Sequence, residues 1–264
     1  MAEPVYRPVI RIFIGVFRAL RLDLRVSGQE HVPATGGAVV AMNHISYLDF
    51  ALAGVPFWYA HHRLVRFMAK KEVFDHPLSG PLMRGMKHIP VDRSAGAGAY
   101  RAAVDALRRG ELIGVFPEAT ISRSWCLKEF KSGAVRMAQE AGVPVIPVIV
   151  WGSHRVLTKG RPRNLRAARG TEVSITVGEP MTVEPAADVT VATKELAEAM
   201  GALLDDAQRR YHADPAGAPW WLPARMGGSA PTLAEAAALD ADDERRRHEH
   251  RAERAARAER RRKA

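Results

Sequence analysis

The chain has 264 residues, of which 47% are apolar and 26% are charged. This length predicts one substantial domain with appendages, or two small domains, with a core that needs no disulfide or metal cross-link. Cys126 is the one cysteine, which excludes an intrachain disulfide and any cysteine-built zinc or iron–sulfur site. Lys and Arg number 39 against 29 Asp and Glu, and the net charge of +10 favours an anionic partner: nucleic acid, an acidic membrane face or a phosphorylated molecule.

An apolar helix interrupted by arginines is predicted at the N-terminus, over residues 8–22. Arg11 and Arg18 are seven residues apart and so lie on one side of this helix, while large apolar residues fill the rest. No uncharged apolar run is long enough to span a membrane. The pattern predicts a membrane-interface segment over residues 1–23, and the alternative is a helix packed on the core.

The centre of the chain alternates strand and helix patterns. Such alternation predicts an α/β domain over residues 24–212, with a mixed central sheet flanked by helices. Pro144 and Pro147 indicate an edge or irregular position for their strand. Gly110 and Gly142 are the expected ends of two helices. The predicted strands are 37–42, 112–116, 143–150 and 173–177, and the predicted helices are 99–109, 129–141 and 193–211.

The last part of the chain, residues 213–264, is predicted to be a linker and a charged tail. Pro and Gly residues interrupt it first, around the pair Trp220 and Trp221. From residue 241 onward Glu and Arg recur at helical spacing with almost no large apolar residue, so a solvated tail is expected, and the spacing is compatible with a helix. Binding to anionic lipid or nucleic acid is the alternative.

A cluster of polar residues follows the predicted strand 37–42. Carboxyl ends of strands are where α/β folds place ligands and catalytic groups. His44 can act as a general base, and Asp49, five residues later, can fold back to orient its ring. The alternative is structural: Ser46 and Asp49 resemble a helix capping box, and His44 is then a loop histidine.

The pattern Asn43-His44-x-Ser46-x-x-Asp49 resembles the first motif of the 1-acylglycerol-3-phosphate acyltransferases, within the glycerolipid acyltransferases. Further blocks agree with that family in the same order, and the resemblance extends from about residue 24 to 180. These blocks are Phe67–Glu72, Gly85–Arg93, Val115–Thr120, Phe130–Ala134 and Gly142–Val148.

The resemblance implies a glycerol-3-phosphate acyltransferase-like fold and transfer of a fatty acyl group to the hydroxyl of lysophosphatidic acid in phospholipid biosynthesis. The donor would be the thioester of acyl-CoA or acyl carrier protein, with no cofactor and no metal. His44 would deprotonate the acceptor hydroxyl, Asp49 would orient the ring, and Asn43 and Ser46 would support the turn. No covalent intermediate is expected, because neither a Gly-x-Ser-x-Gly elbow nor a base for Cys126 is evident.

The family motifs also imply substrate-binding residues. Arg93 would hold the acceptor phosphate, since a guanidinium pairs with phosphate in a bidentate manner; a surface ion pair with Asp92 is the alternative. Glu118 and Thr120 would contact the acceptor or cap their turn. Lys70 and Lys71 would extend the anion site or be solvated surface lysines.

Two positions depart from the family pattern. Ala119 replaces a glycine, so a turn that needs positive φ would be strained. Ile121 stands where the family often has an arginine, which Arg123 or Lys128 would replace. A further basic cluster, between Arg155 and Arg169, contains no acid and could meet lipid headgroups, the phosphates of CoA, or only solvent.

The expected partners are a lysophospholipid acceptor, the thioester donor and an anionic membrane surface. The expected location is the cytoplasmic face of the cell membrane, with peripheral or monotopic attachment. Alternative acceptors are glycerol 3-phosphate, a glycolipid or a lyso-aminolipid, and a non-catalytic basic module is the alternative from another class. No nucleic acid is expected, because no helix-turn-helix, zinc-finger or aromatic RNA-binding motif is present.

Overall fold

The computed structural model describes residues 3–92, 96–212 and 219–263. By their internal contacts, residues 1–121 and 127–214 form one compact unit, and residues 122–126 and 215–264 form a second. The sequence-based division at residues 23 and 212 stays a prediction. The predicted Arg93 contact lies outside the described residues.

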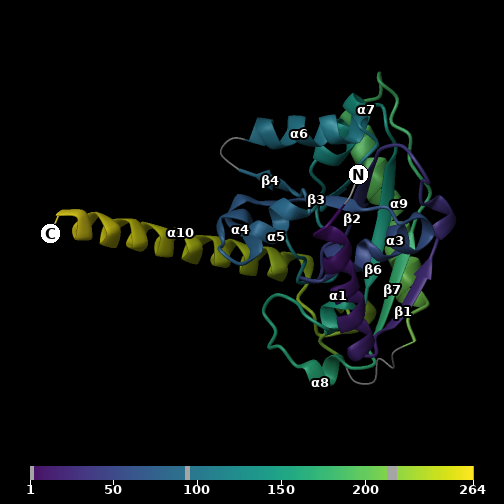
Figure 1. The fold of residues 1–264 in the computed structure, drawn as a ribbon. Coiled ribbons are helices and arrows are strands. Elements are labelled where there is room, and N and C mark those ends of the chain that lie inside the picture. The colour runs from purple at the N-terminus through teal and green to yellow at the C-terminus, as the bar shows by residue number, and fades with distance from the viewer. Residues whose placement is uncertain (1–2, 93–95, 213–218, 264) are drawn as a thin grey trace. The chain divides into compact units, whose positions relative to one another are not determined.

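Within the described residues, the first unit is built on a seven-stranded sheet in the order β1-β7-β6-β2-β5-β3-β4 (Figure 1). All neighbours are parallel except β6 and β7, which run antiparallel, so the sheet is mixed as predicted. The strands are β1 (Asp23–Ser27), β2 (Ala38–Met42), β3 (Val65–Lys70), β4 (Ile89–Val91), β5 (Leu112–Val115), β6 (Val145–Trp151) and β7 (Glu172–Val177).

Helices cover both faces of this sheet, which is why β2, β5 and β6 are apolar and buried along their whole length. On one face Val40, Met42 and Val148 join Leu52 and Phe57 in a single core cluster. On the other face α6, α7 and α9 pack together and against the central strands. The helices of the first unit are α1 (Tyr6–Ala19), α2 (Asp49–Ala53), α3 (Val55–His61), α4 (Lys71–Asp75), α5 (Ser79–Gly85), α6 (Gly96–Arg108), α7 (Gly133–Ala141), α8 (Leu165–Ala168) and α9 (Val189–Arg209).

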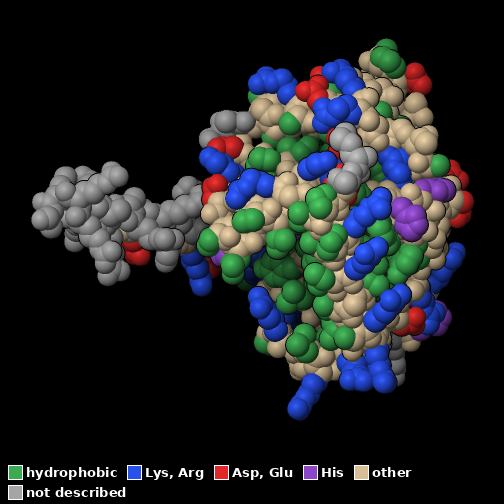
Figure 2. All heavy atoms as spheres, in the orientation of Figure 1, with side chains coloured by type: hydrophobic (Ala, Val, Ile, Leu, Met, Phe, Trp, Pro, Cys, Tyr) green, Lys and Arg blue, Asp and Glu red, His purple; other side chains and the backbone are tan. Residues whose placement is uncertain are grey.

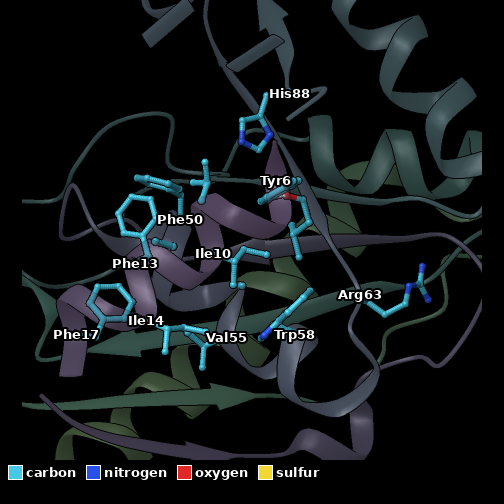
Figure 3. Close-up of a pocket in the computed structure, with 14 residues that line it drawn as sticks. Tyr6, Ile10, Phe13, Ile14, Phe17, Phe50, Val55, Trp58, Arg63 and His88 are labelled. Carbon is cyan, nitrogen blue, oxygen red and sulfur yellow. Dashed lines mark hydrogen bonds between the residues drawn. The ribbon is translucent and has the colours of Figure 1, made fainter. Parts of the chain in front are cut away.

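The N-terminal helix α1 packs one face against α2 and α3. Figure 3 shows Phe13, Ile14 and Phe17 on the side of α1 that meets Phe50 and Val55, around an apolar pocket of about 40 Å³. A network at the start of the chain holds the helix further: the Tyr6 hydroxyl donates to the Val65 carbonyl. Glu3 lies 2.6 Å from the buried guanidinium of Arg66. Tertiary contacts thus fix α1, which lacks a side-chain cap at its N-terminus.

Two expected helix ends are confirmed, because Gly110 and Gly142 have φ of 84° and 67°, the left-handed geometry that favours glycine after a helix. The predicted helix 129–141 is wrong at its start, since α7 begins at Gly133. Backbone groups of the preceding segment bond elsewhere: the Lys128 amide donates to Glu118 and the Lys131 amide donates to the Pro117 carbonyl.

Of the edge or irregular position expected for strand 143–150, the edge position is wrong, because β6 lies between β7 and β2. The carbonyl of Pro147 accepts from Gly178, one residue beyond the end of β7. The missing N–H of Pro147 therefore faces the place where the ladder with β7 ends, and no bond to β2 is lost.

The second unit contains α10 (Leu233–Lys263), a helix with which the Glu/Arg spacing is compatible. Within this unit Arg123 pairs with Asp240 and Asp243 of α10. The Trp125 indole donates to the Trp220 carbonyl at 2.9 Å. Among the residues that the structure describes, no helix has the length and apolar content needed to cross a membrane.

Candidate active site

The turn between β2 and α2 carries the predicted catalytic pair. The buried side chain of Asn43 fixes the end of β2 by exchanging two hydrogen bonds with the backbone of Val150 on β6, at 3.0 and 2.8 Å. His44 follows directly, and Asp49 is the first residue of α2. The turn thus brings the two side chains to the carboxyl edge of the sheet.

His44 Nδ1 lies 3.1 Å from Asp49 Oδ2. The aspartate is fully buried, whereas the histidine side chain is 20% exposed. A carboxylate only accepts hydrogen bonds, so Nδ1 of the neutral ring donates here and Nε2 carries the lone pair. Phe116 stacks on the imidazole with ring centroids 4.0 Å apart, which further limits the ring's orientation.

Asp49 also has a structural role, but it acts within the turn before α2: the helix begins at Asp49 itself, and no side chain caps its N-terminus. Its Oδ2 accepts from the amides of Ile45 and Ser46, both at 2.7 Å. The Ser46 hydroxyl accepts from the Leu48 amide and donates to the Leu157 carbonyl. The same carboxylate therefore shapes the turn and contacts the His44 ring, whereas the capping box suggested by the sequence is not formed at the start of α2.

Ser153 is a residue of this site that the sequence reasoning missed. Its fully buried hydroxyl donates to Asp49 Oδ1 at 2.7 Å. It follows Gly152 immediately after β6, the strand beside β2. Gly152 has φ of 91°, and a Cβ there would meet the Glu172 carbonyl at 2.3 Å. The sequence signal that could have revealed Ser153 is a polar residue shortly after the apolar strand β6, as His44 follows the apolar strand β2.

Glu118 is 5% exposed and lies against the turn of residues 43–48 between β2 and α2, which is called the catalytic turn after its predicted role. One carboxyl oxygen accepts from the His44 amide at 2.9 Å and the other from the Lys128 amide at 3.0 Å. Burial raises the pKa of Glu118 to about 8, because desolvation outweighs these two donors. The structure thus places Glu118 as a brace between two backbone segments; its predicted contact with acceptor hydroxyls stays a prediction.

The turn after Glu118 shows both departures from the family pattern. Ala119 has φ of 60°, which confirms the strained turn expected there. Ile121 is buried. Of the two suggested replacements for the missing arginine, Arg123 pairs with the aspartates of α10, whereas the Lys128 ammonium donates to the Thr120 hydroxyl at 2.7 Å.

A groove of about 620 Å³ opens beside His44. Of the predicted lysines, the exposed Lys70 lines it, whereas Lys71 does not and lies 3.6 Å from Asp92. Lys131 also lines the groove and was not among the predicted site residues. The apolar lining includes Met68, Val73, Val91, Val115, Phe116 and Met137.

No group of three or more His, Cys, Asp or Glu side chains suited to a metal ion occurs in the part of the chain that the structure describes. The polar groups around the turn between β2 and α2 bond to one another: His44 and Ser153 both contact the Asp49 carboxylate.

Comparisons with known proteins agree with the motifs. Residues 23–151 match the family model described as Acyltransferase. The 1-acyl-sn-glycerol-3-phosphate acyltransferase of Bacillus subtilis is 31% identical over 143 residues, which are 53% of this chain and 68% of that protein. The protein of the same name from Limnanthes douglasii is 34% identical over 143 residues, but the match covers 49% of its length. The 1-acyl-sn-glycerophosphate (LPA) acyltransferase PlsC of Thermotoga maritima superposes with a TM-score of 0.63 and 25% identity, over 78% of this chain and 81% of that one.

The mixed α/β sheet and the histidine–aspartate turn at its carboxyl edge define an acyltransferase. The chain belongs to the 1-acyl-sn-glycerol-3-phosphate acyltransferase family, which confirms the resemblance carried by its motifs.

Proposed function

We propose that this chain transfers a fatty acyl group from a thioester to the free hydroxyl of a 1-acyl-sn-glycerol 3-phosphate. The observation that carries the proposal is the buried Asp49 carboxylate on Nδ1 of His44, at the wall of a largely apolar groove. The family relatives named for this reaction support the choice of acceptor.

The mechanism follows from the tautomer of His44. Its Nε2 takes the proton of the acceptor hydroxyl, and the oxygen attacks the thioester carbonyl carbon. The carbon–sulfur bond then breaks, and the thiolate leaves with the proton that the imidazolium returns. The products are an ester and a free thiol. Asp49 holds the ring in this tautomer and stabilises the imidazolium that forms between the two proton transfers.

The groove beside His44 offers binding surfaces for the acyl chain and for the acceptor phosphate. Its apolar walls suit a fatty acyl chain, delivered by acyl-CoA or by acyl carrier protein. Lys70 and Lys131 on the same groove suit the phosphate of the acceptor, with Arg93 as a further predicted contact. No cofactor takes part in these steps.

The acceptor is a lipid, and α1 suits the surface of a bilayer. One side of the helix exposes Ile12 (64%) and Val16 (46%) beside the exposed Arg11 and Arg18. Apolar side chains with flanking arginines fit the zone between acyl chains and anionic headgroups. We propose that the enzyme acts at the cytoplasmic face of the cell membrane, with peripheral or monotopic attachment.

The test is release of free thiol from palmitoyl-CoA by the purified protein. Lysophosphatidic acid, glycerol 3-phosphate and an unphosphorylated lyso-lipid serve as separate acceptors, with His44→Ala beside the wild type. We expect thiol release that depends on lysophosphatidic acid and is lost in the variant. Release that persists in His44→Ala would exclude the mechanism, and preference for another acceptor would exclude the substrate.

If palmitoyl-CoA fails with every acceptor, palmitoyl carrier protein is the second donor to test. Failure of both thioesters would favour the non-catalytic basic module.

A further inference from the structure

Residues 159–169 form an exposed basic arm that the proposed mechanism does not use. It carries Lys159, Arg161, Arg163, Arg166 and Arg169, and no Asp or Glu occurs between positions 156 and 171. The four arginines are exposed.

The arm presents an apolar residue among its charges. Leu165 is the first residue of α8 and is 69% exposed, whereas Ala168 on the same short helix is fully buried and fixes α8 to the core. Asn164 caps the helix by accepting from the Ala167 amide. The exposure of Leu165 is therefore built into an ordered turn.

Both ends of the arm are bonded to functional parts of the chain. At its start the Thr158 hydroxyl donates to the Ile45 carbonyl at 2.7 Å, within the catalytic turn. At its end the Gly170 amide donates to the carbonyl of Leu20, one residue beyond α1, at 3.0 Å. The arm thus connects the C-terminal end of α1 to the turn that holds His44.

The surface of α1 and the surface of the arm both combine exposed apolar side chains with exposed arginines. Figure 1 shows α8 beside the lower end of α1. In Figure 2 hydrophobic side chains gather on the face over α1, with Lys and Arg side chains around them and toward α8. Ile12 and Val16 of α1 and Leu165 of the arm are among the large apolar residues that are exposed.

We propose that the basic arm is a second contact with the surface of an anionic phospholipid bilayer, with Leu165 in the interfacial zone and the arginines on lipid phosphates. The proposal rests on the proposed function, because it brings the catalytic turn to the layer in which a lipid acceptor resides. Binding of the CoA phosphates is the competing explanation, but it would require only the arginines and would give Leu165 no role. The exposed leucine between the arginines, together with the exposed apolar residues of α1, favours a bilayer.

The first experiment measures where residue 165 goes. A Leu165→Cys change in a Cys126→Ser background is labelled with the environment-sensitive dye NBD, and Val191→Cys on α9, where the valine is 55% exposed, is the matched control. We expect a blue shift and brighter emission at position 165 with vesicles of phosphatidylglycerol and phosphatidylcholine. Position 191 should not change. Unchanged emission at 165 would overturn the proposal.

The second experiment removes the charges. Replacing Arg163, Arg166 and Arg169 with Gln should weaken binding to the anionic vesicles by roughly tenfold or more, because each basic residue near such a surface adds to its attraction. Acyl transfer to acceptor in detergent micelles should keep its wild-type kcat and KM. A raised KM for acyl-CoA in micelles would assign the arm to the donor instead and overturn the bilayer contact.

The proposed acyl transfer and the proposed bilayer contact are tested by different measurements, so one can be excluded without the other. Absence of transfer by the wild-type protein with every donor and acceptor would remove the proposed function, while the labelling result at position 165 would still report on the bilayer contact.

Discussion

The Ser153 hydroxyl donates a hydrogen bond of 2.7 Å to Asp49 Oδ1, although the two residues are 104 positions apart. Asp49 is thereby held from two sides: Ser153, just after β6, bonds one carboxyl oxygen, and the catalytic turn with His44 bonds the other. Both side chains are fully buried. The orientation of the histidine thus depends on a contact between two neighbouring strand ends.

Ser153→Ala should lower kcat by roughly tenfold with little change in either KM. It leaves a buried carboxylate oxygen without its donor, at a cost of about 1–3 kcal/mol, and lets Asp49 turn away from the ring. Ser153→Thr keeps a hydroxyl and should recover most of the rate. Thr193→Val, which removes a hydroxyl bonded only within α9, is the control for general destabilisation. Steady-state kinetics with each substrate varied decide this, and an unaltered kcat in Ser153→Ala would remove Ser153 from the positioning of Asp49.

Asp49→Asn should reduce kcat by about 10³–10⁴ while substrate binding persists, because an amide favours the wrong histidine tautomer. The replacement also places an NH₂ group near the amides of Ile45 and Ser46, so circular dichroism must first show that the variant is folded. Asp92→Asn, at a half-buried aspartate near Lys71, should keep wild-type turnover. Turnover within about tenfold of wild type in folded Asp49→Asn would contradict the orienting role.

The sequence predicted the contact between His44 and Asp49 and missed the contacts that distant segments make with them. His44 and Asp49 are five residues apart, so one turn suffices to bring them together. Ser153 and Glu118 reach the same turn from other strands, and a single sequence does not show which strand ends are neighbours. The hydrogen bond from the His44 amide to Glu118 was unpredictable for a further reason, because a backbone donor leaves no pattern in the sequence.

In the fold, too, the sequence predicted the elements that have a local signal and missed those that depend on distant contacts. Fully apolar central strands such as β2 and β5 were found, because burial on both faces leaves a continuous signal. The strand β3 was missed, since it contains Arg66, whose buried charge is accommodated by Glu3, Glu111 and the Met86 carbonyl from distant parts of the chain. The edge strand β4 has three residues, too few for any period.

Lys131→Ala should raise the KM for the phosphorylated acceptor by about tenfold or more, because a charge-assisted hydrogen bond to phosphate contributes about 1.5–3 kcal/mol. The KM for the thioester should change little. Lys71→Ala is the matched control, since Lys71 does not line the groove and lies beside Asp92. Initial rates at varied acceptor concentration test this. Equal effects of the two lysine variants would exclude Lys131 from the phosphate site.

Glu118→Gln should change stability in a way that depends on pH. The pKa of Glu118 is about 8 in the folded protein against a usual value of 4.5, so between these values the folded state binds more protons than the unfolded state. The free energy of unfolding of the wild type should therefore fall, relative to the glutamine variant, as pH rises from about 5 to about 8. Urea unfolding of both proteins across this range measures the difference. A difference that stays constant with pH would show that Glu118 does not titrate in this interval.

Ala119→Gly should raise the free energy of unfolding by up to about 1 kcal/mol. An alanine at φ of 60° lies in the left-handed region, which costs an L-residue about 1–2 kcal/mol, and glycine removes that cost while gaining some freedom in the unfolded chain. Ala102→Gly, on the exposed side of α6, should lower stability by about 1 kcal/mol. The opposite signs of these two identical substitutions, measured by urea unfolding, isolate the strain of the turn from the general cost of glycine. Destabilisation by both would mean that the turn at Ala119 holds no strain that glycine relieves.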